Sequence, residues 1–282
     1  MKKCFLTPIV SVLMTSFNRE KYIGEAIESV LSSTFKEFEL IIVDDCSADR
    51  TVEIARKYAS QDSRIRVYVN KNNIGDYPNR NRAASFAKGE YLKYLDSDDT
   101  LFTYTLERMV SYMTIDKTIG LGLVVRDHCS ESNVGKIWNT SLSYKKQFFQ
   151  DGFLENGPTG AIILKAAFDK VGGFSGKRMI GDVELWLKIA LHYKVVELPK
   201  FLVFHRVHAS QESKSGFEFY LIDQLKMFSE IFAEKDCPLS FLEKKQIIKK
   251  RKNINTWVLF RYFAKSGDIK RFINLFVKLI KV

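Results

Sequence analysis

The chain has 282 residues and a net charge of +11 at pH 7, with 46% hydrophobic and 27% charged residues. This length and composition are typical of a globular protein with a sizeable core, and they exclude an intrinsically disordered chain. The four cysteines lie far apart and form no CxxC pair, which excludes a zinc knuckle and a small disulfide framework and favours a reducing cytoplasm.

The positive charge is concentrated near the C-terminus. Residues 241–282 contain twelve Lys or Arg residues and two acidic residues, so the rest of the chain is nearly neutral. A nucleic-acid-binding core needs basic residues along its face, and we therefore expect no nucleic-acid partner. No uninterrupted apolar stretch approaches the ~20 residues that cross a bilayer. We expect a cytoplasmic protein, with peripheral contact with the inner face of the cell membrane as the alternative.

The first hundred residues alternate between two kinds of apolar pattern. Apolar runs predict strands and helical spacing predicts helices. The expected strands are 8–17, 38–45, 65–70 and 91–95, and the expected helices are 19–35, 48–59 and 79–88. Regular alternation of this kind implies right-handed crossovers and a mainly parallel sheet covered by helices on both faces.

Beyond residue 99 the alternation becomes less regular. In chain order we expect a helix at 101–113, a strand at 120–127, a polar loop at 128–151, a strand and a helix within 160–174, a helix at 182–193 and an extended segment at 194–206. From residue 216 onward the pattern is helical only. The simplest division is one α/β domain, residues 1–215, followed by a helical basic extension, residues 216–282.

Three of the expected strands end in polar residues, in the segments "TSFN", "VDD" and "DSDD". Ligands of open parallel sheets bind beyond the carboxyl ends of the strands, so these segments plausibly share one site. In "DSDD", the carboxylates Asp96, Asp98 and Asp99 repel one another unless water or a cation relieves the charge. One interpretation is a site for a hard divalent cation. The other is a solvated turn with a helix cap.

Two common nucleotide sites are excluded by the loops that the sequence lacks. The turn after the first strand has no GxGxxG motif, and the chain has no GxxxxGK[ST] loop. Neither a dinucleotide-binding enzyme nor a P-loop protein is supported. What remains is a nucleotide held by carboxylates and hydroxyls, with a metal ion on its phosphates.

The segments "PIVSVLMTSFNREKYIGEAIESVLSSTFKEFELIIVDDCSADRT", "NRNRAASFAKGEYLKYLDSDD" and "GDVELWLKIA", in this order, resemble family 2 glycosyltransferases. The resemblance covers roughly the first 215 residues and implies an inverting enzyme with a glycosyltransferase A-type fold. It also implies Mg²⁺ or Mn²⁺ as the cofactor and a nucleotide-sugar donor, for which we expect UDP. The implied acceptor is a glycan or a lipid-linked glycan in bacterial surface-polysaccharide synthesis.

The resemblance assigns the strand ends to the donor nucleotide and the metal. It places the base and ribose near Thr15, Phe17, Asn18 and Asp45, because a carboxylate can accept the N3–H of uracil and an aromatic ring can stack on a base. For Thr15 and Phe17 the alternative is strand-end packing.

Asp96 and Asp98 form the family's DxD pattern. The resemblance implies that Asp96 contacts the nucleotide and that Asp98 and Asp99 bind the cation. A divalent cation there would offset the charge on the departing diphosphate.

Inversion requires a carboxylate that takes the proton of the acceptor hydroxyl. In the family this base belongs to an acidic pair before a helix that begins with Leu-Trp. Here the segment reads "MIGDVELW", so Asp182 matches the base while Gly181 stands where an acid is usual, with Glu184 nearby. The alternative role of Asp182 is a helix N-cap.

The late segment "FHRVHASQES" resembles the family's Arg-x-His segment. The resemblance implies that Arg206 pairs with the diphosphate and that His208 binds the metal or donates to a phosphate. The alternative for His208 is an ordinary core or loop histidine, and His205 is ranked below it. Arg80 can reach a phosphate, as can Arg82, or both can lie on a solvated helix face.

The segment "DIKRFINLFVKLIK" near the C-terminus predicts an amphipathic basic helix. It either lies on an anionic membrane surface or packs its apolar face on the catalytic domain. For the whole chain, the alternative to an enzyme is a non-catalytic nucleotide- or carbohydrate-binding protein that keeps the fold, and Gly181 is the feature that supports it. A nucleotidyltransferase is a weaker alternative, because its glycine-rich basic loop is missing.

Overall fold

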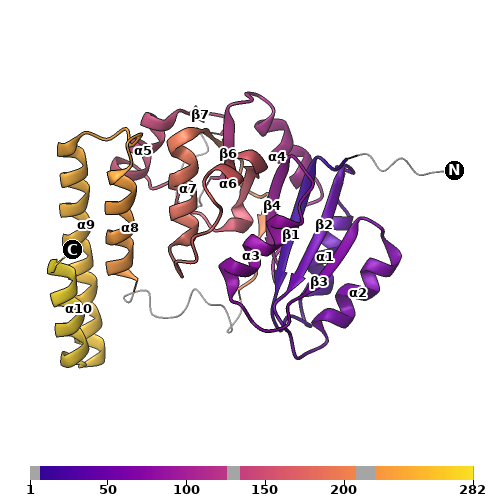
Figure 1. Ribbon diagram of the computed structural model, residues 1–282, viewed down its shortest axis with the longest axis horizontal. Helices are drawn as coiled ribbons and strands as arrows, with labels where there is room; N and C mark the ends of the chain where they lie inside the picture. The colour runs from indigo at the N-terminus through magenta and orange to yellow at the C-terminus, as the bar shows by residue number, and fades with distance from the viewer. Residues whose placement is uncertain (1–6, 126–133, 208–219, 282) are drawn as a thin grey trace.

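The computed structural model describes residues 7–125, 134–207 and 220–281. Its centre is an eight-stranded sheet with the strand order β3-β2-β1-β4-β8-β6-β9-β7 (Figure 1). The strands are β1 (Val10–Ser16), β2 (Phe38–Asp44), β3 (Ile65–Val69), β4 (Tyr91–Asp96), β6 (Ile119–Val124), β7 (Ile137–Trp138), β8 (Ala161–Leu164) and β9 (Lys194–Leu198). The strands β5 (Thr100–Leu101) and β10 (Val203–Phe204) form a separate antiparallel sheet of two strands.

The expectation of a mainly parallel sheet is confirmed. Strands β3, β2, β1 and β4 are parallel neighbours, and β6 is parallel to β9. Strand β8 is antiparallel to both β4 and β6, and β7 is antiparallel to β9. Every residue of β1 and β2 is buried, as is usual where helices cover both faces of a parallel sheet. The carboxyl ends of β1, β2 and β4 therefore meet at one edge.

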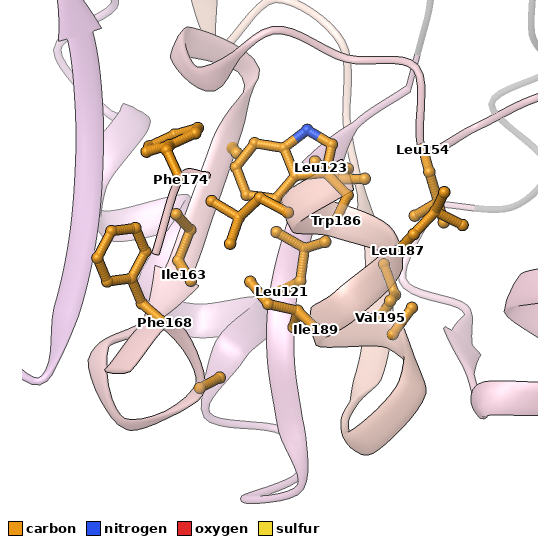
Figure 2. Close-up of a cluster of buried hydrophobic side chains, with 14 of the residues drawn as sticks. Leu121, Leu123, Leu154, Ile163, Phe168, Phe174, Trp186, Leu187, Ile189 and Val195 are labelled. Carbon is orange, nitrogen blue, oxygen red and sulfur yellow. The ribbon is translucent and has the colours of Figure 1, made fainter. Parts of the chain in front are cut away.

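Two hydrophobic clusters cover the two faces of the sheet, and alternation along β1 divides its residues between them. Leu13 joins one cluster, while Val12 and Met14 join the other. The first cluster contains the fully buried Trp186, whose indole N–H donates to the Asn156 carbonyl at 2.8 Å (Figure 2). The helices around the sheet are α1 (Ile23–Leu31), α2 (Thr51–Gln61), α3 (Asp76–Ser85), α4 (Thr105–Met113), α5 (Thr140–Phe149), α6 (Lys165–Lys170) and α7 (Gly181–His192).

Two predicted element boundaries are wrong. Within the expected polar loop 128–151, the described part from residue 134 contains β7 and α5. Helix α5 has a local N-cap, since Asn139 accepts from the Leu142 N–H. It also makes a tertiary contact that its sequence does not reveal, because the Tyr144 hydroxyl donates to the Leu187 carbonyl. The helix expected at 101–113 begins only at Thr105, because the two residues of β5 pair with β10.

The C-terminal part is helical, as expected, and consists of α8 (Leu221–Ala233), α9 (Phe241–Ser266) and α10 (Ile269–Lys281). Phe228 and Phe232 of α8 pack edge-on against Phe148 of α5, so α8 joins the main core. Helix α10 packs on α8 and α9 rather than on the α/β domain. The expected boundary after residue 215 lies outside the described residues. Of the helices in the described ranges, none combines the length and the apolar character needed to span a bilayer.

Candidate active site

A cavity of about 880 Å³ opens where β1, β2 and β4 end. Its volume is within the usual range for small-molecule sites. One wall comes from the strand ends and the loop before α3, and the other from the short 3₁₀ helix Pro158–Gly160 and the N-terminus of α7. The candidates on its walls are Thr15, Phe17, Asp45, Arg80, Asp96, Asp98, Asp99 and Asp182.

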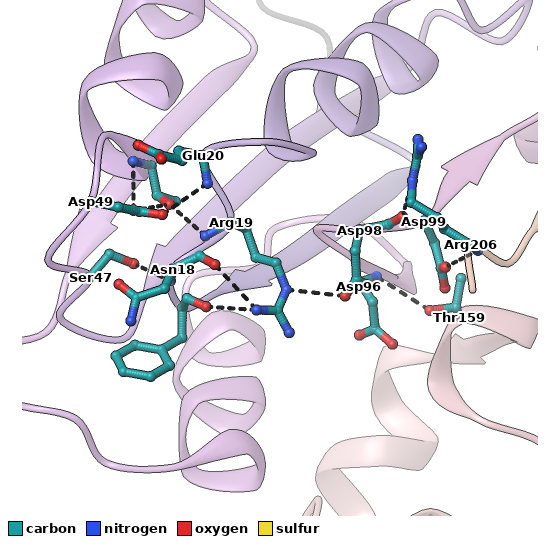
Figure 3. Close-up of polar contacts among 12 residues, drawn as sticks. Asn18, Arg19, Glu20, Ser47, Asp49, Asp96, Asp98, Asp99, Thr159 and Arg206 are labelled. Carbon is teal, nitrogen blue, oxygen red and sulfur yellow. Dashed lines mark hydrogen bonds and ion pairs between the residues drawn. The ribbon is translucent and has the colours of Figure 1, made fainter. Parts of the chain in front are cut away.

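Each carboxylate of the "DSDD" segment contacts a basic side chain. Arg80 lies 2.7 Å from Asp96, the Arg19 Nε donates to Asp98 at 3.0 Å, and the His205 Nδ1 lies 3.0 Å from Asp99. Figure 3 shows Arg19 reaching from the loop after β1 towards Asp98. The two guanidinium groups relieve the repulsion among the three acids, and the hydrogen bond with Asp99 raises the pKa of His205.

The segment itself is a tight turn, because the Asp99 N–H donates to the Asp96 carbonyl at 2.9 Å. Burial alone would raise the pKa of Asp96, but the charge of Arg80 outweighs it and the pKa lies below its ordinary value. Asp96 is therefore ionised at neutral pH. Its own N–H donates to the Thr159 Oγ1, which ties the strand end to the opposite wall of the cavity.

Asp45 is held in a fixed orientation at the end of β2. Its carboxylate accepts hydrogen bonds from the Asn70 side chain at 2.6 Å and from the backbone N–H groups of Ile74 and Gly75, each at 2.9 Å. An ionised carboxylate has about four acceptor positions, so these three donors leave capacity for a ligand. Its neighbour Asp44 is turned to Ser16 and Ser47 and does not line the cavity.

Two described candidates, Asn18 and Arg206, are not among the residues that line the cavity. Asn18 joins two loops, since its N–H donates to Ser47 and its side chain accepts from the Ala48 N–H (Figure 3). The Arg206 N–H donates to Asp99 at 3.0 Å, and its guanidinium donates to the Asp98 carbonyl and contacts Glu25. Both residues therefore support the site from outside the cavity.

Of the two histidines in the segment "FHRVHASQES", the sequence ranked His208 above His205 as a site residue. His208, the predicted metal ligand, lies outside the described residues. His205, which the sequence ranked lower, lines the cavity and contacts Asp99. The antiparallel pairing of β10 with β5 brings this segment to the carboxylates, a contact between residues more than a hundred positions apart.

Asp182 lies in the first turn of α7, on the wall opposite the strand ends. Burial raises its pKa to about 7; Arg80 acts in the opposite direction, and Asp76 and Asp96 add to the rise. The Oδ1 atom of Asp182 is buried and has no hydrogen-bond partner among the described residues. Asp182 makes no N-cap hydrogen bond, since the N-cap of α7 is Ile180. The helix-cap alternative is therefore wrong.

Glu184 is excluded as an alternative base by its surroundings. Its carboxylate contacts Ser175, Lys177 and Lys188, and the residue does not line the cavity. These partners outweigh burial and hold the pKa of Glu184 below its ordinary value.

Arg80 is the charged residue that sequence reasoning placed least clearly, and it is buried at the centre of the site. Its guanidinium bridges Asp76 at 2.8 Å and Asp96 at 2.7 Å. Burial would lower its pKa, but these two carboxylates raise the pKa well above the ordinary value. The Nη1 group is buried without a hydrogen-bond partner among the described residues, so Arg80 retains a donor on a residue that lines the cavity.

The residues at the strand-end wall of the cavity fit a divalent cation bound together with a diphosphate. Mg²⁺ is usually held by one or two carboxylates plus substrate phosphates, and Asp98 and Asp99 both line the cavity. In the described part of the chain, no group of three or more His, Cys, Asp or Glu side chains is arranged to hold a metal ion by itself.

Residues 11–172 match the family model for glycosyl transferase family 2. Glycosyltransferase GlyG of Streptococcus pneumoniae serotype 4 is 28% identical over 257 residues, which cover 84% of this chain and 83% of GlyG. Among solved structures, S. aureus TarS 1-349 in complex with UDP-GlcNAc is similar with a TM-score of 0.75 and 23% identity, over 96% of this chain and 80% of TarS. Mannosyltransferase PcManGT from Pyrobaculum calidifontis, in complex with GDP-Man and Mn²⁺, is similar with a TM-score of 0.66 and 18% identity, over 98% of this chain and 85% of PcManGT.

The fold is the glycosyltransferase A type that the sequence predicted, with a helical C-terminal part. Together with the family match, it defines the class of the protein as an α/β glycosyltransferase. The chain belongs to glycosyl transferase family 2, as the motifs in the sequence indicated.

Proposed function

We propose that the chain is an inverting, metal-dependent glycosyltransferase that moves a sugar from a UDP-linked donor to a hydroxyl of a glycan or lipid-linked acceptor. Residues 1–215 form the catalytic domain in this proposal. The observation that carries it is the position of Asp182, whose free carboxylate oxygen shares a cavity with the strand-end carboxylates. A setting in bacterial surface-polysaccharide synthesis follows from the resemblance to the family.

The donor lies against the strand ends in this proposal. Asp45 accepts from the base, Phe17 stacks on it, and Thr15 contacts the nucleotide at the end of β1. The unpartnered Nη1 group of Arg80 donates to a phosphate oxygen. UDP as the nucleotide is supported by the likeness to a structure that contains UDP-GlcNAc.

Asp98 and Asp99 hold a divalent cation, which supplies positive charge for the departing diphosphate. A structural relative that contains Mn²⁺ supports this choice of cofactor. His205 and Arg206 keep the Asp99 carboxylate oriented towards the cavity. Arg19 does the same for Asp98.

Asp182 takes the proton of the acceptor hydroxyl while that oxygen attacks the sugar carbon from the face opposite the diphosphate. A general base works best when its pKa lies near the working pH, and the pKa of Asp182 is about 7. The buried, unpartnered Oδ1 is the atom that accepts this proton.

Calorimetric titration tests the donor half of this proposal. UDP, GDP and CDP are titrated into the wild type, Asp98→Asn and the control Asp223→Asn, each with Mn²⁺ and with EDTA. We expect UDP alone to bind, only with Mn²⁺, and to bind the control as it binds the wild type but not Asp98→Asn. Metal-independent binding would contradict the role of the cation, and absence of nucleotide binding would contradict the proposed function.

Slow hydrolysis of the donor sugar separates an enzyme from a non-catalytic binding protein with the same fold. We expect the wild type to release UDP from a UDP-sugar in the presence of Mn²⁺ and Asp98→Asn to release none. A wild type that binds the donor and never cleaves it, with any acceptor added, would favour the binding protein.

A further inference from the structure

The hairpin formed by α9 and α10 exposes large apolar side chains. On α9, Trp257 is 71% exposed and Phe260 is 46% exposed. On α10, an apolar residue is exposed every three or four positions, which places these residues on one stripe of the helix. The five residues that we call the hairpin face are Trp257, Phe260, Ile273, Val277 and Ile280.

Another stripe of α10 already holds the hairpin together. Leu275 and Leu279 are buried in a cluster with α8 and α9 residues. Phe272 packs on Phe260 and Phe263 of α9, with ring centroids 5.1 Å apart in each case. Phe260 takes part in this contact and is also partly exposed, while Trp257, Ile273, Val277 and Ile280 are additional to the residues that fold the hairpin. Exposed apolar residues gathered in this way mark an interaction site.

The α9 and α10 parts of the hairpin face adjoin. The ring of Phe260 lies 6.2 Å from that of Phe276, the residue between Ile273 and Ile280 on α10. In Figure 1 the hairpin forms the edge of the molecule opposite α2, with α9 and α10 side by side.

Basic side chains surround the apolar residues. Residues 241–282 contain twelve Lys or Arg against two acidic residues. The exposed basic residues among those described in the two helices are Lys245, Lys249, Lys250, Arg261, Lys265, Lys270, Arg271 and Lys278. A partner must therefore cover apolar side chains and neutralise positive charge at the same time.

We propose that the hairpin face binds the surface of an anionic lipid bilayer. Trp and branched apolar side chains enter the boundary between headgroups and acyl chains, while the lysines contact anionic headgroups. A second copy of the chain would bring two strongly basic surfaces together, so repulsion opposes a dimer through this face. A nucleic acid would satisfy the lysines but leave the apolar residues in water. The proposal goes beyond the proposed function and does not depend on it.

Co-sedimentation of the full chain with vesicles tests the proposal. The vesicles contain phosphatidylcholine alone or phosphatidylcholine with phosphatidylglycerol. We expect the wild type to bind the anionic vesicles at least tenfold more tightly than the neutral ones. Lys270→Gln/Lys278→Gln should weaken binding roughly tenfold or more, because each lysine near an anionic surface contributes to the affinity. The matched control Arg56→Gln/Lys57→Gln, which removes two exposed charges from α2, should change binding less than twofold.

The apolar contribution is tested with Trp257→Ser/Val277→Ser. Both residues are exposed, so the thermal midpoint should stay at that of the wild type while vesicle binding falls at least tenfold. The control Ile115→Ser, at an exposed apolar position in the α/β domain, should bind vesicles like the wild type.

Tryptophan fluorescence reports the contact directly. The chain has three tryptophans, of which Trp186 is fully buried and Trp138 is half-buried. We expect anionic vesicles to shift the emission of the wild type to shorter wavelength and that of Trp257→Phe to remain unshifted, although this variant still binds. Failure of the wild type to bind anionic vesicles would overturn the proposal, as would equal losses in the α2 control. A lipid-free dimer that Trp257→Ser dissociates would show instead that a second copy covers this face.

Discussion

The ring of Tyr77 fills the space beside Gly181 that a side chain at that position would need. A Cβ atom on Gly181 would lie 2.8 Å from two ring carbons of Tyr77, closer than real Cβ contacts allow. Tyr77 is buried and stacks on Phe174 with ring centroids 5.1 Å apart. Gly181 stands where the family resemblance leads us to expect an acid, and packing by the Tyr77 ring accounts for the absence of a side chain there.

We therefore predict that Gly181→Ala lowers the free energy of unfolding by about 1–3 kcal/mol, the usual cost of overpacking. The sign of this change distinguishes overpacking from helix propensity, because alanine is otherwise the better helix residue by up to about 1 kcal/mol and would raise the free energy of unfolding. Urea denaturation measures the change. Gly157→Ala is the control, since a Cβ there meets no atom within 4 Å and its φ of −73° suits alanine. Stabilisation by Gly181→Ala would contradict the overlap with Tyr77.

Asp182→Asn should remove most of the activity without removing donor binding. Loss of a general base costs about 10²–10⁴ in rate, whereas the donor is held by the other wall of the cavity. The activity of the wild type should rise with pH through about 7, because the base must be ionised and its pKa is about 7. Initial rates measured from about pH 5.5 to 8.5, a range centred on that pKa, give the loss of activity and its pH dependence. Calorimetry over the same range gives the donor affinity.

Glu184→Gln is the control for this prediction. Glu184 lies in the same helical turn but contacts Lys177 and Lys188 instead of the cavity. It should keep the rise of activity near pH 7. A rise that persists unchanged in the residual activity of Asp182→Asn would assign the pH dependence to another group.

Arg80→Met should move the pH dependence and weaken donor binding together. Arg80 holds the pKa of Asp182 down against the effect of burial, so its removal should shift the rise of activity to higher pH, by about one unit or more. Loss of its Nη donor should weaken UDP binding about tenfold. Arg80→Lys keeps the charge and should shift the pH dependence less. The control is Arg82→Met on the same helix, where the guanidinium lies over the Phe86 ring; a similar shift in this variant would contradict the prediction.

The mainly parallel sheet, and hence the edge where the site lies, could be predicted because the alternation of strands and helices is a local pattern. Asp45, Asp96 and Asp98 each follow an apolar run, and the carboxyl ends of parallel strands must meet. The partners of these acids could not be predicted in this way. His205 reaches Asp99 through the two-residue pairing of β5 with β10, too short to leave a periodic signal. Asn18 has the right place in the sequence for a donor contact, yet its left-handed backbone, with a φ of 53°, turns it to the 47–48 loop.

The role of Lys93 could not be predicted from the sequence either. A lysine within an apolar strand is expected to face solvent, whereas Lys93 is buried. The side chain is fully buried in β4, and its Nζ donates to the carbonyls of Tyr94, at 2.9 Å, and Thr159. Thr159 belongs to the wall of the cavity opposite the strand ends. Lys93 therefore ties that wall to β4 from behind the site.

Burial lowers the pKa of Lys93 to about 7, although Asp96 and Asp99 act in the opposite direction. The unfolded chain, with the ordinary pKa of 10.5, then binds more protons than the folded chain between pH 7 and 10.5. Stability contributed by this group must rise with pH across that window, by up to about 1.4 kcal/mol per pH unit. We expect urea denaturation to show that the free energy of unfolding of the wild type increases relative to that of Lys93→Met as the pH rises from about 7 to 9.5, which lies between these two pKa values. The comparison cancels the titration of all groups that do not interact with Lys93, and carboxylates, such as the coupled Asp96 and Asp99, ordinarily titrate below this pH range. A difference that stays constant with pH would therefore mean that Lys93 does not change protonation between the folded and unfolded states in this range.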